Sequence, residues 1–263
     1  VAQELIAFYR RPGIERAWVN NGGDIAVHLA PGQTARVGVY ADLARFDWRD
    51  ANGLVDTDGQ FELRADQPVR GVATSGWRGR SFTHGIADSV TVLAATAAQA
   101  DAAATVIANA VDVDNDAIRR VPASERKDNS DLGDTLVTVD VPPQPPAQVR
   151  SASDAGAVCA RVLQKGGLAW AALLVCQGQW RLVEPLCSKL GFRAVGSVIA
   201  YAARLQRHRA AKHHTAFFLH IRLRMPRNYP TGKDRSHESR KEGPSCLPGT
   251  NHPVPRPEGK RGG

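Results

Sequence analysis

Residues 71–105, "GVATSGWRGRSFTHGIADSVTVLAATAAQADAAAT", contain the two elements that decide the fold. The stretch "SVTVLAA" (89–95) is apolar and rich in β-branched residues, which predicts a buried strand. It leads directly into "AAQADAAATVIANAV" (97–111), a run of the best helix-forming residue, alanine. A buried strand followed at once by a helix predicts a domain in which helices cover a sheet.

The flanking sequence predicts further short strands and few helices. Alternating or β-branched runs predict strands at 14–19, 25–29, 36–40, 60–64, 70–75 and 135–141, and a strand, turn and strand within 168–183. Helical patterns cover 1–11 and 154–167, while 41–58 and 112–134 are polar and typical of loops. Runs of short strands with a few helices predict an α+β fold rather than a doubly wound sheet.

Residues 20–25, "NNGGDI", separate the first two predicted strands. Paired glycines permit positive φ, and Gly22–Gly23 between two strands is typical of a hairpin turn. Glycines also leave no side chain between a ligand and the backbone N–H groups, which can form an anion-binding concavity. The turn by itself is compatible with either role.

A carboxylate and a hydroxyl lie four residues apart on the predicted helix. Asp101 and Thr105 therefore share one helix face, where both could ligate Mg²⁺, a cation that prefers oxygen ligands. The alternative is that Asp101 only favours the positive helix N-terminus.

Four motifs in this order resemble the ApbE-like superfamily of flavin transferases: G-G-D-I, A-T-S-G, S-V-T-V-x-A and A-D-A-x-x-T. The chain is most similar to an uncharacterised sister family within it, in which "VNNGGDIA", "GIADSVTVLA" and "ADAAAT" occur nearly verbatim. The resemblance covers roughly residues 1–184. It implies an incomplete mixed or antiparallel sheet with flanking helices. ApbE proteins cleave FAD and attach FMN through a phosphoester to a Thr of a target protein, using Mg²⁺.

The resemblance assigns roles to residues of this chain. It implies that Asp101 and Thr105 bind Mg²⁺ at the pyrophosphate of FAD. It places seven residues beside the flavin nucleotide, namely Asn21, Gly22, Gly23, Asp24, Thr74, Ser75 and Gly76. His84 is the candidate for the catalytic histidine, the alternative being an incidental turn residue, because the H-I-I-D-P segment and loop of ApbE are replaced by the shorter "THGIADS". Asp88 is either a further ligand or a residue that caps and orients its loop. Two functions therefore stay open: FMN transfer to an acceptor protein, and a flavin- or nucleotide-binding module without transfer chemistry.

The net charge of +8 is concentrated near the end of the chain. From Cys187 onward there are 16 Lys and Arg against 4 Asp and Glu, together with six of the eight histidines. This composition predicts a basic tail of low order at 185–263, beyond a partial ApbE-like domain at 1–184. A frame-shifted reading of a GC-rich gene explains the tail better than nucleic-acid binding does, so we expect no nucleic-acid partner.

The cysteines and apolar runs indicate the compartment. Cys159 and Cys176 lie in apolar runs, which predicts buried free thiols and fits a reducing cytoplasm. The longest apolar runs have about 10 residues, too few to span a bilayer, so we expect no membrane association. Because a chain rarely begins inside a helix beside its own core, we also expect that sequence upstream of Val1 is missing.

Overall fold

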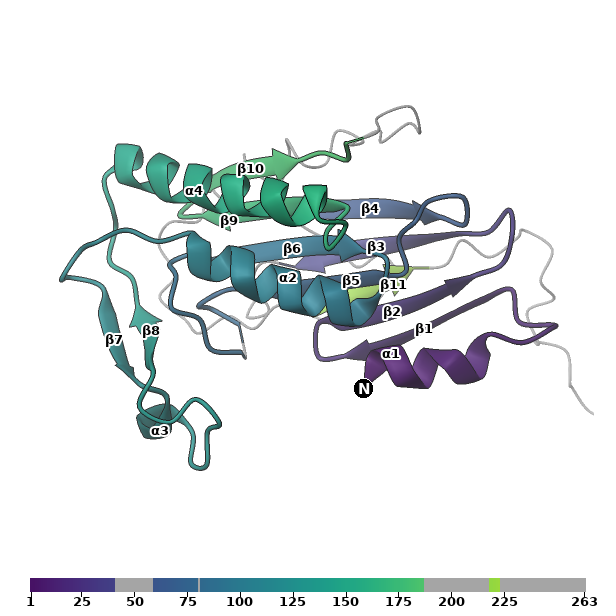
Figure 1. Ribbon diagram of the computed structural model, residues 1–263, viewed down its shortest axis with the longest axis horizontal. Helices are drawn as coiled ribbons and strands as arrows, with labels where there is room; N and C mark the ends of the chain where they lie inside the picture. The colour runs from purple at the N-terminus through teal and green to yellow at the C-terminus, as the bar shows by residue number, and fades with distance from the viewer. Residues whose placement is uncertain (41–58, 80, 187–217, 223–263) are drawn as a thin grey trace, which may run out of the picture. The chain divides into compact units, whose positions relative to one another are not determined.

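The computed structural model describes residues 1–40, 59–79, 81–186 and 218–222. All of them belong to the first of two compact units, Val1–Arg224. Helices combined with antiparallel strands confirm the predicted α+β class (Figure 1). The prediction for 185–263 falls outside the described residues, apart from Pro185, Leu186 and a short strand at Phe218–Arg222.

The main sheet has six antiparallel strands in the order β1-β2-β5-β6-β9-β10. Their bounds are β1 Arg16–Asn21, β2 Asp24–Leu29, β5 Gly71–Ser75, β6 Ser89–Ala94, β9 Ala171–Cys176 and β10 Gln179–Val183. The central strands β6 and β9 are buried at every position because both faces of the sheet are covered there. This explains why their sequences are continuously apolar rather than alternating.

Two helices cover one face of this sheet, α2 (Ala97–Ala110) and α4 (Pro146–Lys165), as Figure 1 shows. Every second residue of β6 packs toward them, including Val90 and Val92. The buried face of α2 consists largely of alanines, which lets its backbone approach β5 closely. The predicted strand–helix core is therefore confirmed.

A smaller antiparallel sheet covers the other face, with strand order β11-β3-β4. Its strands are β3 Thr34–Tyr40, β4 Gly59–Arg64 and β11 Phe218–Arg222. Val37 and Leu63 pack against Ile25 and Val72 of the main sheet. Neighbouring residues of β2 and β5 thus alternate between the two layers, as period-2 strands require.

The prediction that 112–134 forms a loop is wrong for 119–126, in the middle of that range. Strand β7 (Arg119–Pro122) pairs with β8 (Leu136–Asp140), and the short helix α3 (Ala123–Arg126) follows β7. We call β7 and β8 the ribbon; Figure 1 shows it beyond the end of α2. Strand β8 confirms the strand predicted at 135–141, but β7 escaped prediction because it is short, begins with two arginines and ends in proline, which disfavours strands.

Helix α4 begins eight residues before the predicted start at 154. The helix begins at Pro146, the last proline of the run "PPQPP" (142–146). Proline is well tolerated there because the first N–H of a helix has no intrahelical partner and the fixed φ is already helical. The predicted N-terminal helix is present as α1 (Ala2–Leu5) and the 3₁₀ helix η1 (Ile6–Tyr9).

Cys159 and Cys176 are free thiols, as predicted, but only Cys176 is buried and Cys159 is half-buried. Burial raises the pKa of Cys176, whose exposed fraction is 1%. Because only the thiolate reacts readily, we expect iodoacetamide to leave Cys176 unmodified in native protein and to label it in concentrated urea. Peptide mapping by mass spectrometry reports this cysteine separately from the others. Rapid labelling of Cys176 under native conditions would contradict its burial.

Candidate functional site

The "NNGGDI" segment forms a tight hairpin turn between β1 and β2. Asn21 pairs with Asp24, and the two residues between them have positive φ, 69° at Gly22 and 123° at Gly23. The N–H of Gly23 donates to Oδ1 of Asn20 at 3.1 Å. A Cβ on Gly23 would have no neighbour within 4 Å, so space remains beside this glycine. The turn is thus a true hairpin, and its backbone is also approachable on one side.

Strand pairing places this turn beside the end of β5. Ile25 of β2 pairs with Val72 of β5 in antiparallel register. Gly23, two residues nearer the turn, therefore lies level with Thr74, two residues later in β5. Ala26 packs on the face that α1 and α2 cover, where it contacts Ala97. Since side chains alternate along a strand, Asp24 points to this same face. The turn and the strand end "ATSG", distant in sequence, therefore meet at one end of the sheet.

Asp101 and Thr105 lie on the flank of α2 that faces β2. Ala97, one turn before Asp101 on the same side of the helix, packs against Ala26. Asp101 is exposed and Thr105 is half-buried. Among the described residues, neither side chain takes part in a hydrogen bond or ion pair. The Asp101 carboxylate and the Thr105 hydroxyl are therefore both available to a ligand.

The position of α2 along the sheet brings this pair close to the turn. The helix begins beside Gly71, where β5 starts, and its last turn reaches Gly85, just before β6. The step from Gly71 to Thr74 advances three residues along β5, at about 3.3 Å per residue. The same distance takes about six or seven residues of helix, at about 1.5 Å per residue. Thr105 is therefore near the level of Thr74, and Asp101 near that of Asp24.

The three residues of the "TSG" segment do not share one environment. Thr74 Oγ1 lies 2.9 Å from Thr91 Oγ1, and both side chains point to the face away from α2. Ser75 points to the helix-covered face, and its hydroxyl is buried with no partner among the described residues. Gly76 has no room for a side chain, because a Cβ would lie 2.4 Å from the carbonyl oxygen of Asp88. Of the three, Ser75 is the one directed to the α2 side.

His84 lies at the far end of the same flank of α2. Asn109, one turn after Thr105, accepts a hydrogen bond from the His84 backbone N–H at 3.0 Å. The ring atom Nδ1 lies 2.6 Å from the carbonyl oxygen of Leu136 in the ribbon. The stripe Asp101–Thr105–Asn109 thus connects the predicted metal ligands to the predicted catalytic histidine. Sequence reasoning missed Asn109, although D-x-x-x-T-x-x-x-N continues the same helical spacing.

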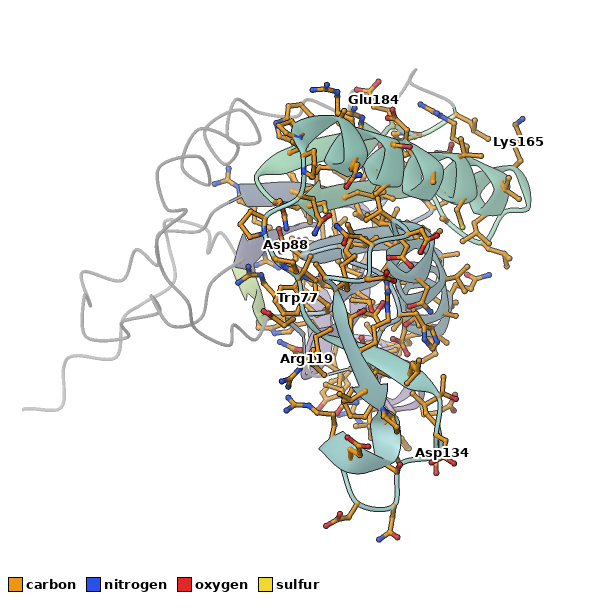
Figure 2. All side chains as sticks on the ribbon, turned by 90° about the vertical axis from the view of Figure 1, so that its left-hand side faces the viewer. Trp77, Asp88, Arg119, Asp134, Lys165 and Glu184 are labelled. Carbon is orange, nitrogen blue, oxygen red and sulfur yellow. The ribbon has the colours of Figure 1, made fainter. Side chains whose placement is uncertain are left out.

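Asp88 orients its loop, which was one of the two roles considered for it. Its Oδ1 accepts from Arg78 Nε at 2.9 Å, and its Oδ2 accepts from the backbone N–H of Gln177 at 2.5 Å. Arg78 also lies over the ring of Trp77, 4.7 Å from its centroid. Figure 2 shows Trp77 and Asp88 near each other at this end of the unit. Both carboxylate oxygens are engaged, so Asp88 joins the β5–β6 loop to the β9–β10 turn.

A second surface lies apart from the predicted site. A groove of about 840 Å³ lies between α4 and β10, lined by Arg161, Trp180 and neighbouring residues, and it contains none of the predicted site residues. Within 1–40, 59–79, 81–186 and 218–222, no three His, Cys, Asp or Glu side chains gather as a metal site. No helix in these ranges is long and apolar enough to cross a bilayer.

The fold and the site define an α+β protein with a glycine turn and an Asp–Thr pair on one side of a central sheet. The family described as "AbpE bacteria" matches residues 1–182, and the chain belongs to this family. This agrees with the resemblance drawn from the motifs, at the level of the family.

The chain also resembles archaeal proteins of the UPF0280 group. It is 42% identical over 112 residues to a UPF0280 protein of Methanothermobacter thermautotrophicus, covering 42% of this chain and 39% of the relative. It is 38% identical over 96 residues to one from Methanobrevibacter smithii, covering 36% of each. The chain thus spans about two fifths of the length of the curated relatives it matches.

Proposed function

We propose that this protein binds FAD together with Mg²⁺ and transfers the FMN part to a Thr of an acceptor protein. The observation that carries the proposal is the convergence of Asp24, Asp101 and Thr105 on one face of the sheet, beside an approachable glycine turn. These residues come from a hairpin and a helix more than 70 positions apart in the sequence. Family membership and the motif resemblance support the same reading.

The donor set fits Mg²⁺. Asp101 and Thr105 offer a carboxylate and a hydroxyl at i and i+4, and hard oxygen ligands of this kind suit Mg²⁺, which keeps further positions for phosphates and water. The buried hydroxyl of Ser75 has no partner among the described residues, as expected of a group that completes its hydrogen bonds with a ligand. Bound at this pair, Mg²⁺ would offset negative charge on the pyrophosphate.

Other residues of the chain would bind the phosphate and accept the proton. The Gly23 N–H already donates to Asn20 Oδ1, so the Gly22 N–H is the donor that this turn would offer to a phosphate. In the transfer, the Thr hydroxyl oxygen forms a bond to the phosphorus of FMN and the bond to AMP breaks. The hydroxyl proton passes to a base, for which His84 is the candidate in this chain.

The proposal is tested by incubating the protein with FAD, Mg²⁺ and a Thr-containing candidate acceptor. We expect AMP release by chromatography and a flavin-fluorescent acceptor band on a denaturing gel, both abolished by EDTA. Omitting the acceptor is the control for simple hydrolysis. No AMP and no labelled protein, with acceptors that an intact relative does modify, would count against transfer.

A nucleotide-binding module without transfer chemistry is the second candidate. It is favoured by the complete engagement of Asp88, because among the described residues no three His, Cys, Asp or Glu side chains gather around the Asp101–Thr105 pair. Calorimetry distinguishes the two functions, because a module binds FAD with no release of AMP. Absence of any flavin or nucleotide binding would exclude the module as well.

A further inference from the structure

His84 is connected to the ribbon through its main chain and its ring. Its carbonyl oxygen accepts from Thr138 Oγ1 at 2.8 Å and from Arg120 Nε at 3.1 Å. Its ring atom Nδ1 contacts the Leu136 carbonyl oxygen at 2.6 Å. The preceding residue is held as well, since the Thr138 N–H donates to the carbonyl oxygen of Thr83 at 2.8 Å. Both strands of the ribbon therefore converge on one histidine.

The contact with Leu136 determines which ring nitrogen carries the proton. A carbonyl oxygen can only accept, so Nδ1 must be the donor in this hydrogen bond. In the neutral ring Nε2 then holds the lone pair. Among the described residues, no hydrogen bond engages Nε2 of His84. The ring is thus set as a base whose accepting nitrogen points away from the ribbon.

The ribbon residues that contact His84 are themselves held in place by burial and an ion pair. Thr138 is buried, with an exposed fraction of 5%, and Arg120 forms an ion pair with Asp112 at 2.6 Å. Burial raises the pKa of the Asp112 carboxyl, while the charge of Arg120 opposes that shift. On the other side, Asn109 holds the His84 N–H from α2. The backbone of His84 is therefore held from two elements, and its ring contacts the Leu136 carbonyl oxygen.

We infer that the ribbon positions His84 as the proton acceptor, with Leu136 fixing the ring tautomer and Thr138 fixing the backbone. This inference rests on the proposed transfer function. Leu136 and Thr138 are positioning residues, because they act through His84. A base must keep its lone pair directed at the acceptor hydroxyl, and small misplacement of a reacting group lowers rates strongly. The ribbon supplies that orientation from residues 52 and 54 positions away in the chain.

The tautomer can be measured without any ligand. In the full chain labelled with ¹⁵N-histidine, long-range ¹H–¹⁵N correlation spectra report which ring nitrogen is protonated, and the His84→Gln variant assigns the signal. We expect the neutral ring of His84 to carry its proton on Nδ1. A proton on Nε2 would overturn the inference, whether or not the protein is a transferase.

A pair of variants tests the positioning role. Thr138→Val removes the hydroxyl that donates to His84 while keeping the side-chain shape, and Thr138→Ser retains that hydroxyl. We expect Thr138→Val to mix the two tautomers and to lower the transfer kcat at least about tenfold, since orientation effects reach about a hundredfold. Thr138→Ser should restore both the tautomer and the rate. Circular dichroism verifies folding, and Arg120→Gln replaces Thr138→Val if the latter does not fold.

The outcomes separate this inference from the proposed function. A protein with the Nδ1–H tautomer that transfers no FMN would refute transfer and leave the tautomer assignment in place. An active protein in which Thr138→Val, folded, changes neither tautomer nor kcat would overturn the positioning role and leave transfer intact.

Discussion

Replacing Asp101 by Asn is expected to abolish Mg²⁺-dependent binding of FAD and to lower any FMN transfer at least about a hundredfold, the scale seen when a group that stabilises developing charge is removed. The amide keeps the size and polarity of the side chain but loses the negative charge that attracts the cation. Asp101 is exposed and takes part in no ion pair among the described residues, so the substitution leaves no charge unpaired in the fold. The change should therefore affect ligand binding and leave stability nearly constant.

Asp154→Asn is the matched control for this variant. Asp154 is also an exposed helical acid, but it lies on α4, where it pairs with Arg181 at 2.8 Å. An exposed pair of this kind contributes at most about 1 kcal/mol, so the control should remain folded and bind FAD normally. Calorimetry with and without Mg²⁺ measures both variants. Equal metal-dependent binding by Asp101→Asn and Asp154→Asn would refute the assigned metal site.

The strength of local sequence signals explains how much of the fold was predictable. Each strand of the main sheet was recognised because alternation or β-branching is a local signal, as in β2 and β6. The early start of α4 was not predicted because proline usually interrupts a helix, although Pro146 occupies the first helical turn, which accepts proline. Strand β8 was recognised, but its pairing with β7 was not, because a short two-stranded element gains its stability from contacts with the body rather than from its own pattern.

The candidate site was predictable residue by residue but not as an arrangement. The i,i+4 relation of Asp101 and Thr105 and the hairpin at Gly22–Gly23 both follow from local rules. Their convergence depends on β2 pairing with β5 and on the direction of α2, which are long-range properties. The same limit applies to Thr74, whose side chain lies on the opposite face from Asp101 because of its register. The contact between His84 and Leu136 has no local signal at all.

The close approach of α2 to β5 gives the second prediction, which concerns stability. A Cβ on Gly71 would lie 2.1 Å from the carbonyl carbon of Thr96, 2.2 Å from its oxygen and 2.3 Å from the N of Ala97. These are backbone atoms at the start of α2, so no rotamer change can relieve the overlap. Gly71→Ala must push the helix N-terminus away from the sheet. We expect it to lower the free energy of unfolding by about 3 kcal/mol, the upper part of the range for overpacked sites.

Gly166→Ala separates this steric effect from the general change of glycine to alanine. Gly166 ends α4 with φ of −79°, and a Cβ there would meet the carbonyl oxygen of Leu163 at an ordinary 3.5 Å. Thermal unfolding followed by circular dichroism should show a Tm lower by roughly 10 °C for Gly71→Ala and nearly unchanged for Gly166→Ala. Equal Tm values would contradict the close packing of α2 on β5. Because that packing also sets the level of Asp101 beside the glycine turn, folded Gly71→Ala protein should bind FAD and Mg²⁺ more weakly than Gly166→Ala.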